Sequence, residues 1–131
     1  MPSRKKDECV ISIDAGTQSI RACLIDFRGN IIQIVKNEID PYFSVNPGWA
    51  EQDPEYFWNV LARTCKKLMS SLVVKKDSIR GVTLTTQRNT MINLDCAGKP
   101  LRPAFIWLDR RKAKPEKWPP LYLRLPMQAA G

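Results

Sequence analysis

Near its start the chain reads Ile11-Ser12-Ile13-Asp14-Ala15-Gly16-Thr17-Gln18-Ser19-Ile20-Arg21 and continues into Ala22-Cys23-Leu24-Ile25. Two apolar runs flank a short turn of small residues, a pattern that predicts strand, tight turn and strand. Gly16 supplies the backbone freedom that the turn needs. It also removes a side chain that would keep a phosphate away from the backbone N–H groups. The stretch therefore predicts a hairpin whose turn can face a phosphate.

The polar residues of this turn suit a nucleotide-phosphate site. Asp14, at the end of the first strand, can hold a hydrated Mg2+, while Thr17, Gln18 and Ser19 offer hydroxyl and amide donors to anionic oxygens. The same pattern also forms an ordinary hairpin, in which Asp14 caps the turn and Gly16 adopts a positive φ without any ligand. Segments further along the chain distinguish the two interpretations.

Length and composition predict one globular domain. A chain of 131 residues can bury a real core but is too short for two domains with a cleft between them. Its 44% hydrophobic and 26% charged residues exclude the disordered class. No apolar run approaches the roughly 20 residues that cross a bilayer, and the basic N-terminal lead, residues 1–8, lacks the apolar core of a secretion signal. We expect a cytoplasmic protein with no membrane partner.

The chain has no histidine and no Cys-x-x-Cys pair, which excludes ordinary zinc sites and His-based triads. Its four cysteines are scattered. Cys9 and Cys23 lie on the two predicted strands, so a cross-strand disulfide is conceivable, but the pattern favours small buried hydrophobic residues.

The net charge of +8 is unevenly distributed. The segment from Lys99 to Gly131 carries a net charge of +6, because it has eight basic residues against Asp109 and Glu116. This predicts a solvated basic face, or a surface that meets an acidic partner, a phosphate or another part of the same protein. No helix-turn-helix, zinc-finger or RNP-like pattern is present, so we expect no nucleic-acid partner.

Two further regular segments follow the hairpin. Residues 26–30 predict a turn and residues 31–35 a third strand, so that three strands form an antiparallel meander. A loop follows over residues 41–48. Asp53 is then a predicted N-cap, with Pro54 as the first helical residue, and the helix ends near Ser70 or Ser71. Its apolar face consists of Phe57, Val60, Leu61, Cys65, Leu68 and Leu72.

The remaining segments predict returning strands. Residues 79–86 and 90–94 are typical of strands, residues 95–100 of a turn, and residues 103–107 of a last short strand. The order predicts an α/β domain with a mixed sheet. Residues 113–131 form a proline-rich basic segment in which the domain looks incomplete.

Four segments, taken in this order, resemble the N-terminal domain of the FGGY family of carbohydrate kinases, over about residues 10–112. They are Asp14-Ala15-Gly16-Thr17-Gln18-Ser19-Ile20-Arg21, Gly48-Trp49-Ala50-Glu51-Gln52-Asp53-Pro54, Thr86-Gln87-Arg88-Asn89-Thr90, and Asp95-Cys96-Ala97-Gly98-Lys99-Pro100-Leu101-Arg102-Pro103-Ala104 running into Trp107-Leu108-Asp109-Arg110-Arg111. The resemblance implies an actin-like, ribonuclease-H-like fold and ATP-dependent phosphorylation of a sugar or polyol hydroxyl.

The resemblance also implies two sets of site residues. The phosphate set is Asp14 beside Mg2+ and the γ-phosphate, the turn Gly16, Thr17 and Gln18, and Arg21 at the edge. The substrate set is Gln87, Arg88, Asn89, Trp107 as a wall, and Asp109 close by. A polyol needs several directional hydrogen bonds and one apolar wall, which this second set supplies. Glycerol kinases have an acid in place of Asn89 and commonly Thr in place of Gln18, which counts against a specific glycerol kinase assignment.

The expected cofactors are ATP and Mg2+, and the expected partners are the substrate and a second kinase domain. In the family, as the resemblance implies, the carboxylate base and most of the adenine pocket belong to that second domain. We therefore expect the 131 residues to bind sugar weakly and to be inactive alone. The alternative is a noncatalytic actin-like module that binds a partner through the surface of residues 99–131. The sequence assigns neither the individual sugar nor an oligomeric state.

Overall fold

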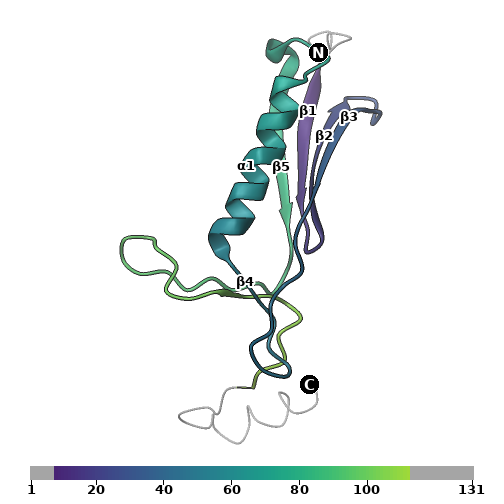
Figure 1. Ribbon diagram of the computed structural model, residues 1–131. Coiled ribbons are helices and arrows are strands. Elements are labelled where there is room, and N and C mark those ends of the chain that lie inside the picture. The colour runs from purple at the N-terminus through teal and green to yellow at the C-terminus, as the bar shows by residue number, and fades with distance from the viewer. Residues whose placement is uncertain (1–7, 113–131) are drawn as a thin grey trace, which may run out of the picture.

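The computed structural model describes residues 8–112 of the chain, so most of the basic lead and all of segment 113–131 lie outside the described residues. Four strands form one sheet in the order β3-β2-β1-β5, with a helix against one face, and two short strands form a separate ribbon (Figure 1). The elements are β1 (Cys9–Ala15), β2 (Ser19–Asp26), β3 (Ile31–Glu38), β4 (Glu51–Gln52), α1 (Pro54–Ser70), a single 3-10 turn (Lys76–Ser78), β5 (Ile79–Thr86) and β6 (Ala104–Phe105).

The predicted meander is confirmed. β1 pairs antiparallel with β2, and β2 pairs antiparallel with β3. Asp26 closes the turn between β2 and β3, because its carboxylate accepts hydrogen bonds from the backbone N–H groups of Arg28 and Asn30 and from the side chain of Asn30. These bonds, above all the one from the Asn30 side chain, lower the pKa of Asp26. Gly29 takes a φ of 89°, which a residue with a Cβ rarely adopts.

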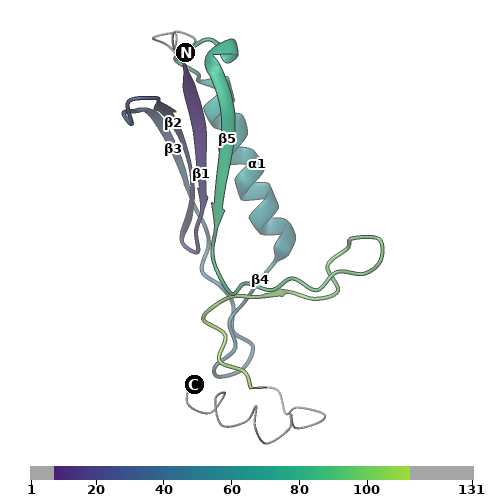
Figure 2. The same cartoon turned by 180° about the vertical axis from the view of Figure 1, so that it is seen from behind.

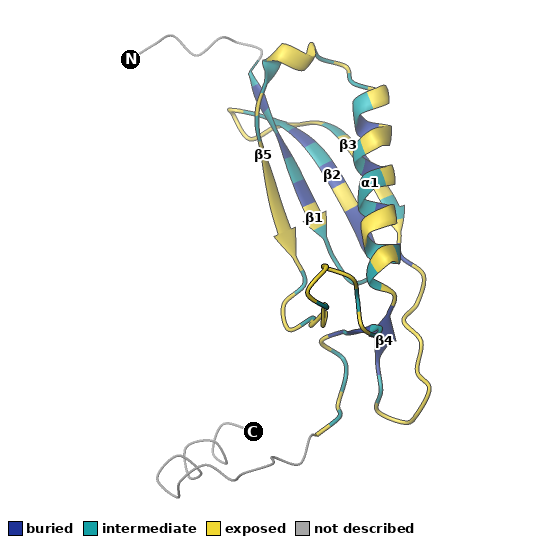
Figure 3. Cartoon of the chain, turned by 90° about the vertical axis from the view of Figure 1, so that its left-hand side faces the viewer, coloured by how far each residue is buried: buried dark blue, intermediate teal, exposed yellow. Residues whose placement is uncertain are grey.

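The sheet is mixed, as predicted, because the chain crosses its face through α1 before it returns. β5 pairs parallel with β1, with Ile13 opposite Leu84 and Ala15 opposite Thr86. β5 occupies the edge of the sheet and is largely exposed, whereas β1 and β2 carry most of the buried positions (Figure 3).

Both predicted ends of the helix are confirmed. The Asp53 side chain accepts a 2.9 Å hydrogen bond from the Glu55 N–H, and Pro54 is the first helical residue. Of the predicted apolar face, Val60 and Leu68 are buried, and the others pack partly buried against the same core. The sequence did not mark Thr64, which is fully buried. Its hydroxyl donates to the Val60 carbonyl at 2.7 Å and accepts from Asn37 on β3 at 2.7 Å.

The prediction of a strand over residues 90–94 is wrong. Met91 and Leu94 form only isolated bridges, to Phe105 and Pro100 respectively. Phe105 belongs to the two-residue strand β6, and the pairing does not extend beyond Met91, so residues 90–94 form no strand. The turn over residues 95–100 is confirmed by the hydrogen bond from the Asp95 N–H to the Lys99 carbonyl. The last predicted strand is confirmed only for the two residues of β6.

The conceivable disulfide is not formed, and the reason is the register of β1 against β2. Cys9 lies opposite Asp26 and Cys23 lies opposite Ser12, so the two cysteines are not cross-strand neighbours. All four cysteines are free. Cys9 is buried in the core, as the favoured interpretation predicted, and its burial raises the pKa of its thiol. Within residues 8–112, no helix has the length and apolar character needed to cross a membrane.

Candidate functional site

The site lies where the carboxyl end of β1 and the carboxyl end of β5 meet. Because the two strands are parallel and adjacent, the chain leaves both of them at the same edge of the sheet. The Gln87 N–H donates to the Ala15 carbonyl at 3.2 Å and extends this pairing one residue past β5. The turn after β1 and the loop after β5 therefore lie side by side, at the end of the sheet that faces the β4–β6 ribbon (Figure 2).

Two adjoining hollows occupy this place. The first, about 460 Å3, is lined by Gly16, Thr17, Gln87, Arg88, Asn89 and Trp107. The second, about 320 Å3, is lined by Gly16, Thr17, Gln18, Ser19, Arg21, Trp107 and Leu108. They share three residues, Gly16, Thr17 and Trp107. The structure thus brings members of the predicted phosphate set and members of the predicted substrate set to the walls of one pocket.

Thr17 connects the three segments of the site through its hydroxyl. The indole Nε1–H of Trp107 donates to Thr17 Oγ1 at 2.9 Å. Thr17 Oγ1 in turn donates to Gln87 Oε1 at 3.1 Å. These residues are 70 and 90 positions from Thr17 in the chain, so sequence spacing alone gave no sign of the connection.

Gly16 is required at this turn because there is little room for a side chain, and not because its backbone is left-handed. The positive φ expected for the ordinary hairpin is absent, because among the described glycines only Gly29, Gly48 and Gly98 have positive φ. Instead, the Gly16 N–H donates to the Ser19 carbonyl at 3.1 Å. A Cβ on Gly16 would lie 3.3 Å from that carbonyl oxygen, which is tighter than an ordinary contact. The turn is narrow, and a small residue keeps its backbone accessible.

Asp14 and Arg21 are cross-strand partners beside the turn. Arg21 Nη1 and Asp14 Oδ2 lie 3.0 Å apart, and both side chains are about half exposed. Asp14 offers hard oxygen ligands, which suit Mg2+. No group of three or more His, Cys, Asp or Glu residues that could hold a metal occurs within residues 8–112. This donor set fits an ion that keeps several waters and arrives with phosphate, in contrast to one held in a protein cage.

Arg88 and Asn89 are, like Trp107, exposed members of the substrate set. Arg88 takes part in none of the ion pairs found within residues 8–112. Asn89 has a φ of 58°, a left-handed conformation that asparagine tolerates better than most residues. The chain therefore turns sharply just after Gln87, and both residues line the first hollow.

Asp109 lies outside both hollows. Its carboxylate accepts from the Ala50 N–H at 2.8 Å and from the guanidinium of Arg111, with the shortest contact at 2.6 Å. The Arg111 hydrogen bonds hold the pKa of Asp109 well below its usual range, although desolvation opposes them, and the Ala50 N–H lowers it further. Asp109 thus fastens the segment that carries Trp107 to the loop before β4. Its predicted place beside a substrate stays a prediction.

No sequence pattern indicated the charged cluster that lies next to the site. Glu51 on β4 is 4% exposed and forms ion pairs with both Arg102 and Arg111. The Arg111 guanidinium also lies 4.1 Å from the ring centres of Trp49 and Phe105. Its members are spread along the chain with no regular spacing, so only the pairing of β4 with β6 assembles them. Arg102 and Arg111, which belong to the predicted basic face, therefore form ion pairs with carboxylates of the same chain.

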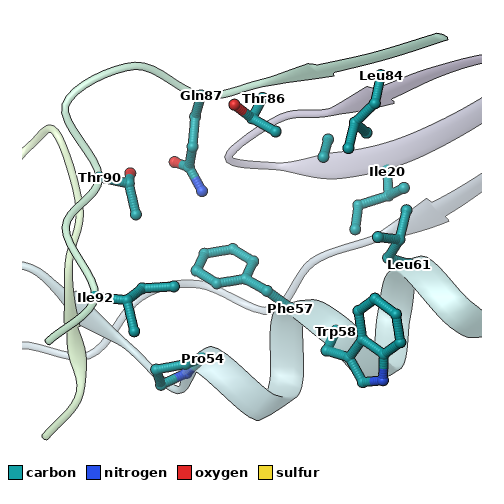
Figure 4. A pocket seen from close by; sticks show the side chains of 11 residues that line it. Ile20, Pro54, Phe57, Trp58, Leu61, Leu84, Thr86, Gln87, Thr90 and Ile92 are labelled. Atoms are coloured by element: carbon teal, nitrogen blue, oxygen red, sulfur yellow. The ribbon is translucent and has the colours of Figure 1, made fainter. Parts of the chain in front are cut away.

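An apolar pocket of about 370 Å3 lies behind the site. Its lining comprises Ala15, Ile20, Pro54, Phe57, Trp58, Leu61, Leu84, Thr86, Gln87, Thr90 and Ile92. Figure 4 shows the side chain of Gln87 extending from the end of β5 toward the ring of Phe57. The Thr90 Oγ1 atom is buried with no hydrogen-bond partner. Gln87 therefore borders both this apolar pocket and the polar first hollow.

Comparisons with known proteins show which family the chain belongs to. Residues 9–118 match the model of the FGGY family of carbohydrate kinases, N-terminal domain. A glycerol kinase from Petrotoga mobilis is 34% identical over 109 residues, which are 82% of this chain and 22% of that protein. The chain thus spans only 22% of the length of this curated relative.

Solved structures with the same fold include two kinases. A xyloylose kinase from Brucella ovis has a TM-score of 0.73 and 29% identity, over 79% of this chain and 22% of that one. The Plasmodium falciparum glycerol kinase with ADP has a TM-score of 0.66 and 32% identity, over 79% and 21%. These similarities confirm the predicted actin-like, ribonuclease-H-like fold with a mixed sheet.

Proposed function

This chain belongs to the FGGY family of carbohydrate kinases, and from that premise we propose that residues 8–112 supply part of the active site of an ATP-dependent kinase acting on a sugar or polyol hydroxyl. One observation carries the proposal. Gly16 and Thr17 share a hollow with Gln87, Arg88 and other groups suited to a polyol. Phosphoryl transfer requires the phosphate and the attacking hydroxyl to be held next to each other, which a shared pocket achieves.

On the phosphate side, the backbone N–H groups and side chains of Thr17 and Gln18 face the anion, since the Gly16 N–H already donates to the Ser19 carbonyl. Arg21 adds a positive charge at the edge of the second hollow. Asp14 would hold Mg2+ through water, and that ion would supply positive charge to the phosphates. The relative from Plasmodium falciparum whose structure contains ADP supports a nucleotide as the phosphate donor.

On the substrate side, Arg88 and Asn89 donate hydrogen bonds to hydroxyl oxygens, and Gln87 both donates and accepts. The ring of Trp107 forms the apolar wall, against which the carbon face of a polyol packs. Asp109 positions this wall indirectly. Its carboxylate binds the Ala50 N–H and Arg111, and these contacts fix the loop that carries Trp107.

The group that accepts the hydroxyl proton belongs to a second domain. Among the described residues that line the two hollows there is no carboxylate. A kinase needs an acceptor within hydrogen-bond reach of the attacking hydroxyl. We therefore expect the 131 residues alone to bind their ligands weakly and not to turn them over.

A thermal-shift screen tests the substrate half of this proposal. We expect glycerol, a pentitol, a pentose or a hexose to raise the melting temperature, and tenfold excess over Kd stabilises by about 1.4 kcal/mol. Arg88→Ala should abolish the response, since it removes the guanidinium from the hollow. Arg63→Ala, on the exposed face of α1, is the matched control and should leave it intact.

Two results would contradict the proposal. A polyol response that persists in Arg88→Ala would show that the ligand binds elsewhere. Salt-sensitive binding to heparin without any polyol response would favour the noncatalytic module. Turnover by the 131-residue chain, lost in Asp14→Ala, would show instead that no second domain is needed.

A further inference from the structure

We propose that the Thr17 hydroxyl is a positioning group that couples phosphate binding to substrate binding, an inference that rests on the proposed function. Within residues 8–112, Thr17 is the one residue whose hydroxyl borders both hollows, and it also bonds to Gln87 and Trp107 of the substrate set. Its role follows from the fact that a hydroxyl has a single proton to donate.

The direction of that proton is set by Trp107. An indole N–H can only donate, so its 2.9 Å contact with Thr17 Oγ1 occupies a lone pair of the oxygen. The Thr17 proton must then point away from the indole, and Gln87 Oε1 accepts it at 3.1 Å. As long as no other acceptor is present, the hydroxyl oxygen accepts from the indole of Trp107 and the hydroxyl proton is donated to Gln87.

A phosphate in the second hollow would compete for the same proton. Ionised phosphate oxygens are acceptors, and hydrogen bonds to a charged acceptor are stronger than bonds to a neutral amide oxygen. When Thr17 turns its proton toward phosphate, Gln87 Oε1 loses its donor. The hydroxyl itself stays in place, because the indole of Trp107 still holds its oxygen.

The released Gln87 oxygen then favours a substrate hydroxyl. Gln87 is only partly exposed and also borders the apolar pocket with Phe57 and Ile92. An acceptor left without a donor in such a place is costly, and a substrate O–H in the first hollow satisfies it. The backbone of Gln87 remains anchored to Ala15, so only the side-chain amide responds. Phosphate bound in one hollow therefore strengthens polyol binding in the other, and the reverse holds by linkage.

The test is NMR of the 15N-labelled 131-residue chain titrated with MgADP. In the wild type, we expect the backbone amides of Gly16 and Thr17 and the side-chain amide of Gln87 to shift together. Thr17→Ser keeps the hydroxyl and should behave in the same way. Thr17→Val keeps the shape but has no proton to transfer, so the Gln87 side-chain signals should not move. The Trp107 indole N–H signal, assigned with Trp107→Phe, should shift in Thr17→Val without ligand and stay in place in Thr17→Ser.

Affinity gives the second measurement. Glycerol should bind on the order of fivefold more tightly with MgADP present in the wild type and in Thr17→Ser, and equally in both conditions in Thr17→Val. Shifts at Gly16 and Thr17 with no response of Gln87 in the wild type would overturn the coupling and leave the proposed function standing. A Thr17→Val chain that keeps the Gln87 response would also overturn it. If MgADP moves none of these signals, the phosphate site itself is disproved, and the coupling with it.

Discussion

Different interactions stabilise the two regions of the molecule, the sheet with α1 and the β4–β6 ribbon. The core between the sheet and α1 consists of ten buried hydrophobic residues, namely Cys9, Ile11, Ile13, Ile20, Ala22, Leu24, Val35, Ile39, Val60 and Leu68. The β4–β6 ribbon is instead organised around the buried carboxylate of Glu51 and its two arginines. Apolar burial depends on area and not on direction, whereas ion pairs and ring contacts fix particular side chains.

The site lies at the junction of these two regions and takes residues from both. Thr17 and Gln87 come from the ends of sheet strands, and Trp107 comes from the segment just after the ribbon. The sheet therefore places the turn over residues 16–18, which we propose binds phosphate, while the charged ribbon helps to determine where Trp107, the proposed wall of the substrate pocket, stands. The following three experiments separate these contributions.

The largest effect is expected for Leu68→Ala, in the core beneath α1. Leu68 is fully buried, so its truncation loses apolar contacts and leaves a cavity. We expect the free energy of unfolding to fall by about 2–5 kcal/mol, measured by urea denaturation followed by far-UV circular dichroism.

The matched control for this change is Leu101→Ala. Leu101 is 66% exposed, so its truncation should cost less than about 0.5 kcal/mol. Equal losses in the two variants would mean that apolar burial does not hold the sheet region together.

A smaller and more local effect is expected for Glu51→Gln. The amide leaves Arg102 and Arg111 without their shared charge partner, and we expect a loss of about 1–3 kcal/mol. Hydrogen exchange should increase first at the amides that link the ribbon, such as Phe105 and Ile106, before the sheet amides respond.

Glu38→Gln provides the comparison for Glu51→Gln. Glu38 pairs with Lys36 on the surface, and its side chain is 71% exposed, so its loss should cost at most about 1 kcal/mol. If Glu51→Gln accelerates exchange in the sheet as much as in the ribbon, the two regions do not behave as distinct units.

The smallest effect is a change in the acid sensitivity of the ribbon. Folding lowers the pKa of Asp109, so its contribution to stability is complete above the usual carboxyl pKa of about 4 and is lost as the pH falls toward the lowered value. Asp109→Asn has no such proton to bind, and its stability should depend less on pH below about 4.

Tryptophan fluorescence during denaturation at several pH values measures this effect. Asp26→Asn is the control, because the pKa of Asp26 is also lowered but the residue lies in the turn between β2 and β3. A pH profile of Asp109→Asn parallel to that of the wild type would contradict the prediction.

Local sequence signals predicted much of the sheet region. The N-cap at Asp53 and the proline after it located the start of α1, since both act through backbone groups of the first turn. The apolar runs on either side of Gly16 predicted β1 and β2. The strand expected at residues 90–94 failed for the opposite reason: its apolar residues suggested a strand, but its pairing with β6 is limited to the single bridge of Met91 to Phe105.

What the sequence alone determined is the three-stranded meander, both ends of α1, the returning strand β5, which chemical groups are available, and the family to which they belong. Only the tertiary structure showed that the Thr17 hydroxyl bonds to both Trp107 and Gln87 and that Asp109 and Glu51 are clamped by arginine. The physical reason is range. Caps, turns and periodicity act between neighbours in the chain, whereas a hydrogen bond across 70 or 90 residues exists only after strand pairing has brought its ends together.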